Sequence, residues 1–173
     1  MKAIQPMLAK TLRKQNVNGW LMSEKLDGVR AVWDGVFLWT RNGNKIDAPS
    51  DWSSHLPKEI PAPIDGELHA GRGGYKTTLS IYRCPHADWS KLTFTAFDLV
   101  MPNATAWERI RKLHTVQVNQ VSHGVARNAS HALELMEQFC TMGGEGVMLR
   151  NPDSEYIHGR TKHLLKLKPG EGA

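Results

Sequence analysis

Two tight-turn dipeptides within ten residues, Asp34-Gly35 and Asn42-Gly43, constrain the fold of this chain more than any other feature. Dipeptides of this kind adopt the backbone conformation that joins adjacent antiparallel strands. The flanking segments Val29–Trp33 and Val36–Thr40 are short and largely apolar, as the two strands of a hairpin should be. The sequence therefore predicts an antiparallel sheet in the first half of the chain.

Other strands are predicted by apolar runs that end at turn residues. They are Trp20–Glu24, Lys45–Ile46, Ile64–Ala70, Leu92–Val100, Gly146–Arg150 and His163–Lys168. Residues 47–63, rich in Pro and Ser, are predicted to be mostly loop. Short strands joined by hairpins, with few helices, favour an α+β fold with antiparallel sheets over a doubly wound parallel sheet.

Two helices are predicted between these strands. The first covers Thr105–His114, with Trp107, Ile110, Leu113 and His114 at helical spacing. The second begins after Ser130 as N-cap and ends at Gly143-Gly144. Its apolar stripe, which we expect to lie in the core rather than at a cofactor, consists of Leu133, Met136, Phe139 and Cys140.

Length and composition predict one globular domain. The 173 residues are 40% hydrophobic and 23% charged, and the net charge of +5 favours a polyanionic partner such as nucleic acid. The sequence has no apolar run long enough to span a membrane and no apolar signal-peptide core, so we expect a cytoplasmic protein without a membrane partner. Cys84 and Cys140 are expected to be reduced thiols.

Charged residues also fall in segments that otherwise read as buried or half-buried strand, where charge is costly unless it is paired or bound. The clusters are Lys25–Arg30 (KLDGVR), Asp65–Leu68 (DGEL) with Phe97-Asp98, Glu145–Arg150 (EGVMLR) and Lys166–Pro169 (LKLKP with Leu165). No Rossmann fingerprint or P-loop accounts for them. Together they predict a site for a nucleotide phosphate.

A lysine nucleophile attacking phosphorus needs such neighbours. The amine must be neutral, and nearby cations such as Lys166 and Lys168 favour the neutral form. Cations also neutralise the phosphate oxygens, carboxylates such as Glu67 and Glu145 suit Mg²⁺, and an aromatic ring can stack on a base.

Each residue also has a structural interpretation. K-x-D-G alone is a weak signal, and Lys25 taken by itself is more often a solvated charge. Glu67 and Glu145 are compatible with structural ion pairs, and Phe97 with the core. Lys166 and Lys168 are compatible with protection of an edge strand.

The order of the motifs favours the functional interpretation. From about Pro6 to Pro169 the sequence resembles the nucleotidyltransferase (adenylation) domain of ATP-dependent DNA ligases, especially the minimal ligases of bacteria and phages. The motifs that carry the resemblance are KLDGVR, Thr40–Gly43 (TRNG), DGEL, Phe94–Leu99 (FTAFDL), EGVMLR and LKLKP. The resemblance implies an ATP-grasp-like fold of two antiparallel sheets with flanking helices and a nucleotide cleft between them.

It also implies roles for individual residues. Lys25 would be the catalytic nucleophile that forms lysyl-AMP from ATP. The nucleotide-binding residues would be Arg30, Glu67, Phe97, Glu145, Lys166 and Lys168. Glu67 and Glu145 would bind Mg²⁺ or Mn²⁺, and Arg41 would contact the 5′-phosphate of nicked double-stranded DNA. The implied protein is a monomeric ligase of DNA repair, replication or recombination.

One departure concerns the domains. We expect residues 1–173 to form a single adenylation domain, without the OB-fold domain that follows the last motif, after about residue 169, in this family. Two alternatives remain open at this point: an RNA ligase, which shares K-x-D-G, and a nucleic-acid-binding remnant without full ligase activity.

Overall fold

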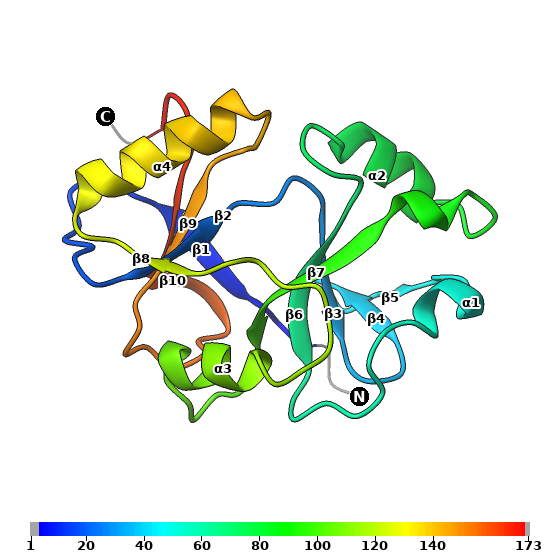
Figure 1. Ribbon diagram of the computed structural model, residues 1–173. Coiled ribbons are helices and arrows are strands. Elements are labelled where there is room, and N and C mark those ends of the chain that lie inside the picture. The colour runs from blue at the N-terminus through cyan, green and yellow to red at the C-terminus, as the bar shows by residue number, and fades with distance from the viewer. Residues whose placement is uncertain (1–3, 172–173) are drawn as a thin grey trace.

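The computed structural model describes residues 4–171 and contains two five-stranded sheets that lie side by side (Figure 1). Sheet 1 has the order β1-β10-β9-β2-β8, formed by Met7–Thr11 (β1), Gly159–Leu167 (β10), Val147–Arg150 (β9), Leu21–Glu24 (β2) and Gly124–Val125 (β8). Sheet 2 has the order β5-β4-β3-β6-β7, formed by Lys45–Ile46 (β5), Leu38–Thr40 (β4), Val29–Trp33 (β3), Ile64–His69 (β6) and Thr93–Leu99 (β7). The predicted α+β class is confirmed.

The direction of one strand pair differs from the expectation of two antiparallel sheets. All ladders of sheet 2 are antiparallel, but β1 and β10 of sheet 1 run parallel. Sheet 1 is therefore mixed. A parallel pair is joined by a long crossover rather than a tight turn, so no local turn signal predicts it.

The helices lie around the two sheets (Figure 1). Their bounds are Ser50–Ser53 (α1), Tyr75–Tyr82 (α2), Ala106–Leu113 (α3) and Ala129–Thr141 (α4), with a 3₁₀ turn at Trp89–Lys91. Buried residues of α4 share a core cluster with β9 and β10 of sheet 1, and α2 packs on β3 and β6 of sheet 2. Helix α3 contacts β7, and its Ala106 and Ile110 cluster with Leu21 of β2. It therefore lies against both sheets.

Both predicted helices exist, with corrected details. Helix α4 begins at Ala129, because Asn128 rather than Ser130 caps it by accepting a hydrogen bond from the His131 N–H. Leu133 of the predicted core stripe is 43% exposed, and Ala132 is buried in its place. Helix α3 ends at Leu113, with His114 as its C-cap. Ile110 and Leu113 are buried as expected, whereas Trp107 and His114 are exposed.

Strand boundaries agree only in part: β4, the second strand of the first predicted hairpin, begins at Leu38 rather than Val36. β3 and β5 have the predicted bounds, whereas β10 begins four residues before His163. The predicted loop 47–63 contains the short helix α1, and the sequence analysis did not predict β1 or α2.

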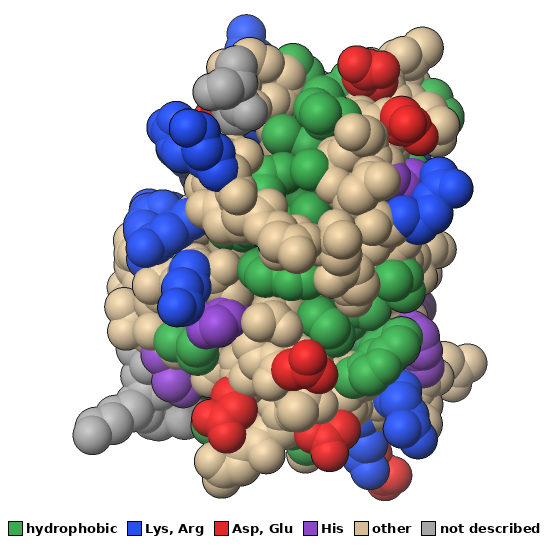
Figure 2. All heavy atoms as spheres, turned by 90° about the vertical axis from the view of Figure 1, so that its left-hand side faces the viewer, with side chains coloured by type: hydrophobic (Ala, Val, Ile, Leu, Met, Phe, Trp, Pro, Cys, Tyr) green, Lys and Arg blue, Asp and Glu red, His purple; other side chains and the backbone are tan. Residues whose placement is uncertain are grey.

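Surface charge is uneven on the end of the molecule that lies at the left of Figure 1. Figure 2 shows Lys and Arg side chains along both the left and the right edges of this face, with hydrophobic side chains between them. Across residues 4–171, no helix is both long and apolar enough to cross a membrane.

Candidate active site

Lys25 stands on the segment that carries the chain from sheet 1 to sheet 2. It directly follows Glu24 at the end of β2, and its backbone N–H donates to the carbonyl of Gly146 at 2.9 Å. At the other end of the segment, a Cβ on Gly28 would lie 2.0 Å from the Leu68 carbonyl oxygen, so only glycine permits this packing against β6. Both sheets therefore fix the position of Lys25.

Glu145 accepts hydrogen bonds from two lysines. Lys25 Nζ lies 2.5 Å from Glu145 Oε2, and Lys168 Nζ pairs with Oε1. These residues meet because β9 pairs with both β2 and β10. Burial acts to raise the pKa of Glu145, but the hydrogen bonds from Lys168 and Lys25 outweigh burial and lower the pKa. The carboxylate is therefore held in its ionised form.

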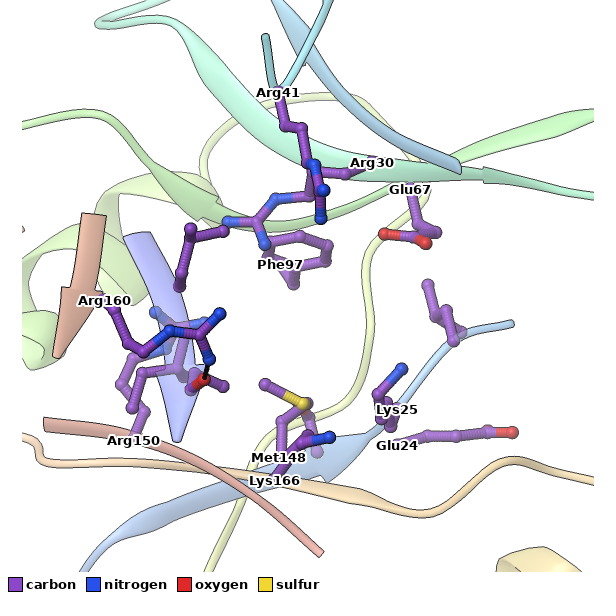
Figure 3. A pocket seen from close by; sticks show the side chains of 15 residues that line it. Glu24, Lys25, Arg30, Arg41, Glu67, Phe97, Met148, Arg150, Arg160 and Lys166 are labelled. Atoms are coloured by element: carbon purple, nitrogen blue, oxygen red, sulfur yellow. Dashed lines mark hydrogen bonds between the residues drawn. The ribbon is translucent and has the colours of Figure 1, made fainter. Parts of the chain in front are cut away.

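Glu67 on β6 is the second carboxylate near Lys25. Burial raises its pKa to about 7, although the positive charges of Arg30 and Lys25 act in the opposite direction. Figure 3 shows Glu67 and Lys25 approaching one another from opposite sides of the cavity. Within residues 4–171, Glu67 forms no ion pair. It is therefore available to a ligand.

Arg30 on β3 is held rigidly at the interface between the sheets. Its Nε and Nη2 each lie 2.5 Å from an oxygen of Asp65, and Nη2 also donates to the Met7 carbonyl at 3.1 Å. Asp65 accepts a further hydrogen bond from the Tyr156 hydroxyl at 2.6 Å. The guanidinium lies 4.6 Å from the Phe97 ring centroid, a cation–π contact.

A cavity of about 280 Å³ opens between the sheets beside Lys25 (Figure 3). Its walls come from β1, β2, β9 and β10 of sheet 1, from β3, β6 and β7 of sheet 2, and from the segments next to β2 and β4. Two acidic residues, Glu24 and Glu67, and six cationic ones line the cavity; the cations are Lys25, Arg30, Arg41, Arg150, Arg160 and Lys166. Four of the six pair with carboxylates, whereas Arg41 and Arg160 form no ion pair within residues 4–171. A cavity with this charge fits a phosphate-bearing ligand.

Most of the predicted site residues gather here. Lys25, Arg30, Arg41, Glu67, Phe97 and Lys166 all line the cavity. Glu145 and Lys168 do not; Glu145 lines a neighbouring cavity of about 310 Å³, and Lys168 reaches the site through Glu145. The sequence analysis assigned no role to Met148, Arg150 or Arg160, which also line the cavity.

A buried charge network supports the wall of the cavity at Arg150. Asp98 at the end of β7 accepts a hydrogen bond from Arg150 Nη1 at 2.5 Å and from Arg109 Nε at 2.7 Å. Arg109 is fully buried in α3 and also donates to the carbonyls of Ala104 and Ser154. The sequence analysis missed this network, because an arginine on a helix is usually exposed.

The predicted metal ligands fit a metal ion unequally. In the described part of the chain, no group of three or more His, Cys, Asp and Glu residues is arranged to hold a metal. Both oxygens of Glu145 are occupied by lysines, whereas Glu67 faces the cavity without an ion pair in residues 4–171. Mg²⁺ commonly takes one or two carboxylates together with substrate phosphates and water. The donor set suits a metal that arrives with a nucleotide.

A lysine amine at a cation-lined cavity between two sheets, flanked by carboxylates, is the arrangement of a covalent nucleotidyltransferase. The family model of the ATP dependent DNA ligase domain matches residues 3–168. This chain belongs to that family, which confirms the resemblance seen in the sequence.

Individual relatives agree. A DNA ligase of Haemophilus influenzae is 33% identical over 174 residues, which cover 96% of this chain and 64% of the relative. A solved structure from a study of "Lig E DNA ligases" is 36% identical with a TM-score of 0.82, covering 94% of this chain and 68% of that one. A Chlorella virus DNA ligase-adenylate, 24% identical with a TM-score of 0.78 over 96% of this chain and 67% of its own, shares the fold. The chain thus spans about two thirds of the length of these relatives.

Proposed function

We propose that this chain is the domain of an ATP-dependent DNA ligase in which Lys25 takes AMP from ATP and passes it to the 5′-phosphate of a nick. The observation that carries the proposal is the place of Lys25. Its amine lies 2.5 Å from Glu145 at the edge of a cavity that has six cationic side chains in its walls. A nucleophile and a phosphate site therefore meet at one point.

The first step would be the formation of lysyl-AMP. The Lys25 ammonium loses one proton to water and its ion pair with Glu145 breaks. The neutral amine then forms the Nζ–P bond and loses a second proton to water, which leaves the phosphoramidate. The bond from the α-phosphorus to the bridging oxygen breaks, and pyrophosphate leaves with the electron pair. Glu145 keeps Lys168 as its partner throughout, so this half-buried carboxylate never loses all its counter-ions.

The remaining residues would bind and orient the nucleotide. Arg30 and Lys166 would stabilise negative charge on the phosphates. Phe97 and Met148 offer the large apolar surfaces of the cavity wall, which suit a base. Mg²⁺ or Mn²⁺, held by Glu67 and the phosphates, would supply further charge neutralisation at the α-phosphate, and Glu145 would share this role only after releasing a lysine.

Sealing of nicked double-stranded DNA is the proposed outcome. Arg41 would meet the 5′-phosphate, and the 3′-hydroxyl would then displace AMP from it. We infer that residues 1–173 form one adenylation domain that acts as a monomer, and that complete sealing also needs an OB-fold domain. Such an activity would serve DNA repair, replication or recombination in the cytoplasm.

Intact mass spectrometry tests the first step. The protein is treated with pyrophosphate to remove any AMP already bound and then incubated with ATP and Mg²⁺. We expect one added AMP in the wild type and in Lys162→Ala, which alters an exposed lysine of β10, and none in Lys25→Ala. If the wild type gains no AMP even when an OB-fold domain is added, the proposal is wrong.

The polynucleotide substrate needs a second assay. The AMP-loaded protein, supplemented with an OB-fold domain, is offered nicked DNA and nicked RNA duplexes. We expect AMP transfer to the DNA 5′-phosphate. Transfer to RNA alone would indicate an RNA ligase, and binding of DNA without any transfer would indicate a binding module.

A further inference from the structure

Arg72 connects sheet 2 to sheet 1 directly beside Lys25. Its Nε lies 2.7 Å from Glu24 Oε1, and its Nη2 lies 3.0 Å from Oε2. Arg72 belongs to the loop between β6 and α2, whereas Glu24 ends β2 and precedes Lys25. A bidentate pair fixes orientation as well as distance, so this Glu24–Arg72 bridge holds the end of β2 at a set place relative to sheet 2.

The loop that carries Arg72 is anchored to its own sheet. The Ala70 N–H donates to Thr78 Oγ1 at 2.9 Å, and the Gly71 N–H donates to His69 Nδ1 at 3.2 Å. Thr78 is fully buried in α2. Because these contacts lie within sheet 2 and α2, the position of Arg72 does not depend on Glu24.

The bridge is also enclosed on the side of sheet 1. The Arg72 guanidinium lies 5.8 Å from the Phe139 ring centroid, near the end of α4. A Cβ on Gly144 would lie 3.0 Å from Glu24 Oε1, so the chain after α4 passes close to the carboxylate. These contacts leave the Glu24 side chain little freedom to turn elsewhere.

The position of the bridge distinguishes it from the other polar contacts between the sheets. The Asp65–Tyr156 and Asp98–Arg150 contacts are buried, whereas the Arg72 side chain is 38% exposed. Glu24 and Lys25 line both the candidate nucleotide cavity and the neighbouring one, and Arg72 lines only the latter. Figure 3 shows the Glu24 side chain running away from the centre of the cavity. The bridge therefore acts on Lys25 from outside the nucleotide site.

We propose that Arg72 is a positioning residue that, through Glu24, fixes the segment bearing Lys25 so that its amine meets the α-phosphate of ATP. This inference rests on the proposed adenylation reaction. A misplacement of about 1 Å at a reacting centre lowers a rate by roughly 100-fold. Because Arg72 does not line the nucleotide cavity, its loss should change the rate of AMP transfer rather than ATP binding.

Rates of lysyl-AMP formation over a range of ATP concentrations test this role. For Arg72→Ala we expect the maximal rate to fall by about 10- to 100-fold, with the half-saturating ATP concentration within about 3-fold of the wild type. Arg72→Lys keeps the positive charge but loses the two-point contact of the guanidinium. Its maximal rate should therefore lie between those of the wild type and Arg72→Ala. Arg83→Ala alters an exposed arginine that forms no ion pair in residues 4–171, so it should match the wild type.

A double variant tests whether Arg72 acts through Glu24. If it does, Glu24→Gln combined with Arg72→Ala should be no slower than the slower single variant, because both remove one bridge. The inference would be overturned if the rate losses of the two single variants multiplied in the double variant. It would also be overturned if Arg72→Ala kept the wild-type maximal rate or changed only the half-saturating ATP concentration.

Amide hydrogen exchange separates this inference from the proposed function. We expect Arg72→Ala to accelerate exchange in residues 142–146, which lie across the bridge from Arg72. Exchange in residues 70–74 should stay close to that of the wild type, because contacts within sheet 2 and α2 anchor that loop. Exchange that is unchanged in residues 142–146 would contradict the bridge whether or not the protein reacts with ATP. A wild type that forms no lysyl-AMP would instead contradict the proposed function.

Discussion

At the scale of single residues, two carboxylates near Lys25 have opposite pKa shifts although both lie in the walls of neighbouring cavities. Burial raises the pKa of Glu67 to about 7, whereas hydrogen bonds from Lys168 and Lys25 overcome burial and lower the pKa of Glu145. The difference is one of partners, because Glu67 has no lysine or arginine within ion-pair distance in residues 4–171. Of these two carboxylates, Glu67 is therefore the one that changes its charge near neutral pH.

The raised pKa of Glu67 predicts a pH-dependent gain in stability for Glu67→Gln. Between pH 4.5 and about 7 the unfolded chain ionises Glu67 while the folded protein keeps the proton, so the wild type loses stability as the pH rises. The glutamine variant lacks this loss. Urea unfolding should show a gain of up to about 3 kcal/mol at pH 8 and little gain at pH 4.5.

Glu59→Gln is the control, because Glu59 is exposed and lies in a loop. It should leave the free energy of unfolding unchanged at both pH values. The same gain for Glu67→Gln at pH 4.5 and pH 8 would mean that the stabilisation does not come from titration of Glu67. We expect Glu67→Gln to slow lysyl-AMP formation even while it stabilises the fold.

At the scale of elements, the sequence predicts those strand bounds that are set by residues close by in the chain. The bounds of β3 and β5 agree with the structure, and each strand has a turn dipeptide at one end: Asp34-Gly35 follows β3, and Asn42-Gly43 precedes β5. No turn dipeptide marks β1 or the first part of β10. These two strands pair in parallel although they lie about 150 residues apart in the sequence. Register between distant segments depends on packing of the whole sheet, which a local pattern does not contain.

The start of α4 shows how two adjacent capping signals compete, and it yields a prediction. Asn128 accepts a hydrogen bond from the His131 N–H at 2.8 Å, whereas Ser130 lies inside the helix. Asn128→Ala should lower the free energy of unfolding by about 1 kcal/mol, measured by urea unfolding, and Ser130→Ala should leave it nearly unchanged. A larger loss for Ser130→Ala than for Asn128→Ala would instead place the N-cap at Ser130.

At the scale of the whole molecule, one buried carboxylate joins three elements. Asp98 of β7 binds Arg109 of α3 and Arg150 of β9, and so connects sheet 2 both to a helix and to sheet 1. All three side chains are buried. Removal of the shared anion would leave two guanidinium groups without their counter-ion.

Asp98→Asn should therefore lower the free energy of unfolding by about 3 to 5 kcal/mol. Asp51→Asn, at an exposed position in α1, should change it by less than about 0.5 kcal/mol. Both are measured by urea or thermal unfolding. A loss below about 1 kcal/mol for Asp98→Asn would mean that the network contributes little to holding the sheets together.

The candidate site was predictable only in part, because a local sequence pattern does not show which distant segments meet in the fold. The charged clusters identified Lys25, Arg30, Glu67 and Lys166 at the cavity, because charge in a strand is costly without a partner, and Phe97 came with the same clusters. Arg41 was expected only from the family resemblance. Arg160 lies on a part of β10 that the sequence analysis did not recognise as strand. Arg72 lies in a glycine-rich loop with no signal of its own. Its importance arises only where the loop meets Glu24.

The mixed sheet has a consequence for the order in which the molecule assembles during synthesis. Sheet 2 is drawn from residues 29–99, whereas sheet 1 combines β1 and β2 with strands that end at residue 167. Domains formed by nearby residues fold sooner than those that depend on distant pairing. On a ribosome, sheet 2 is therefore expected to form first, and β1 cannot pair until β10 has been synthesised. The candidate nucleotide cavity, which needs walls from both sheets, would be completed only after β10 has been made.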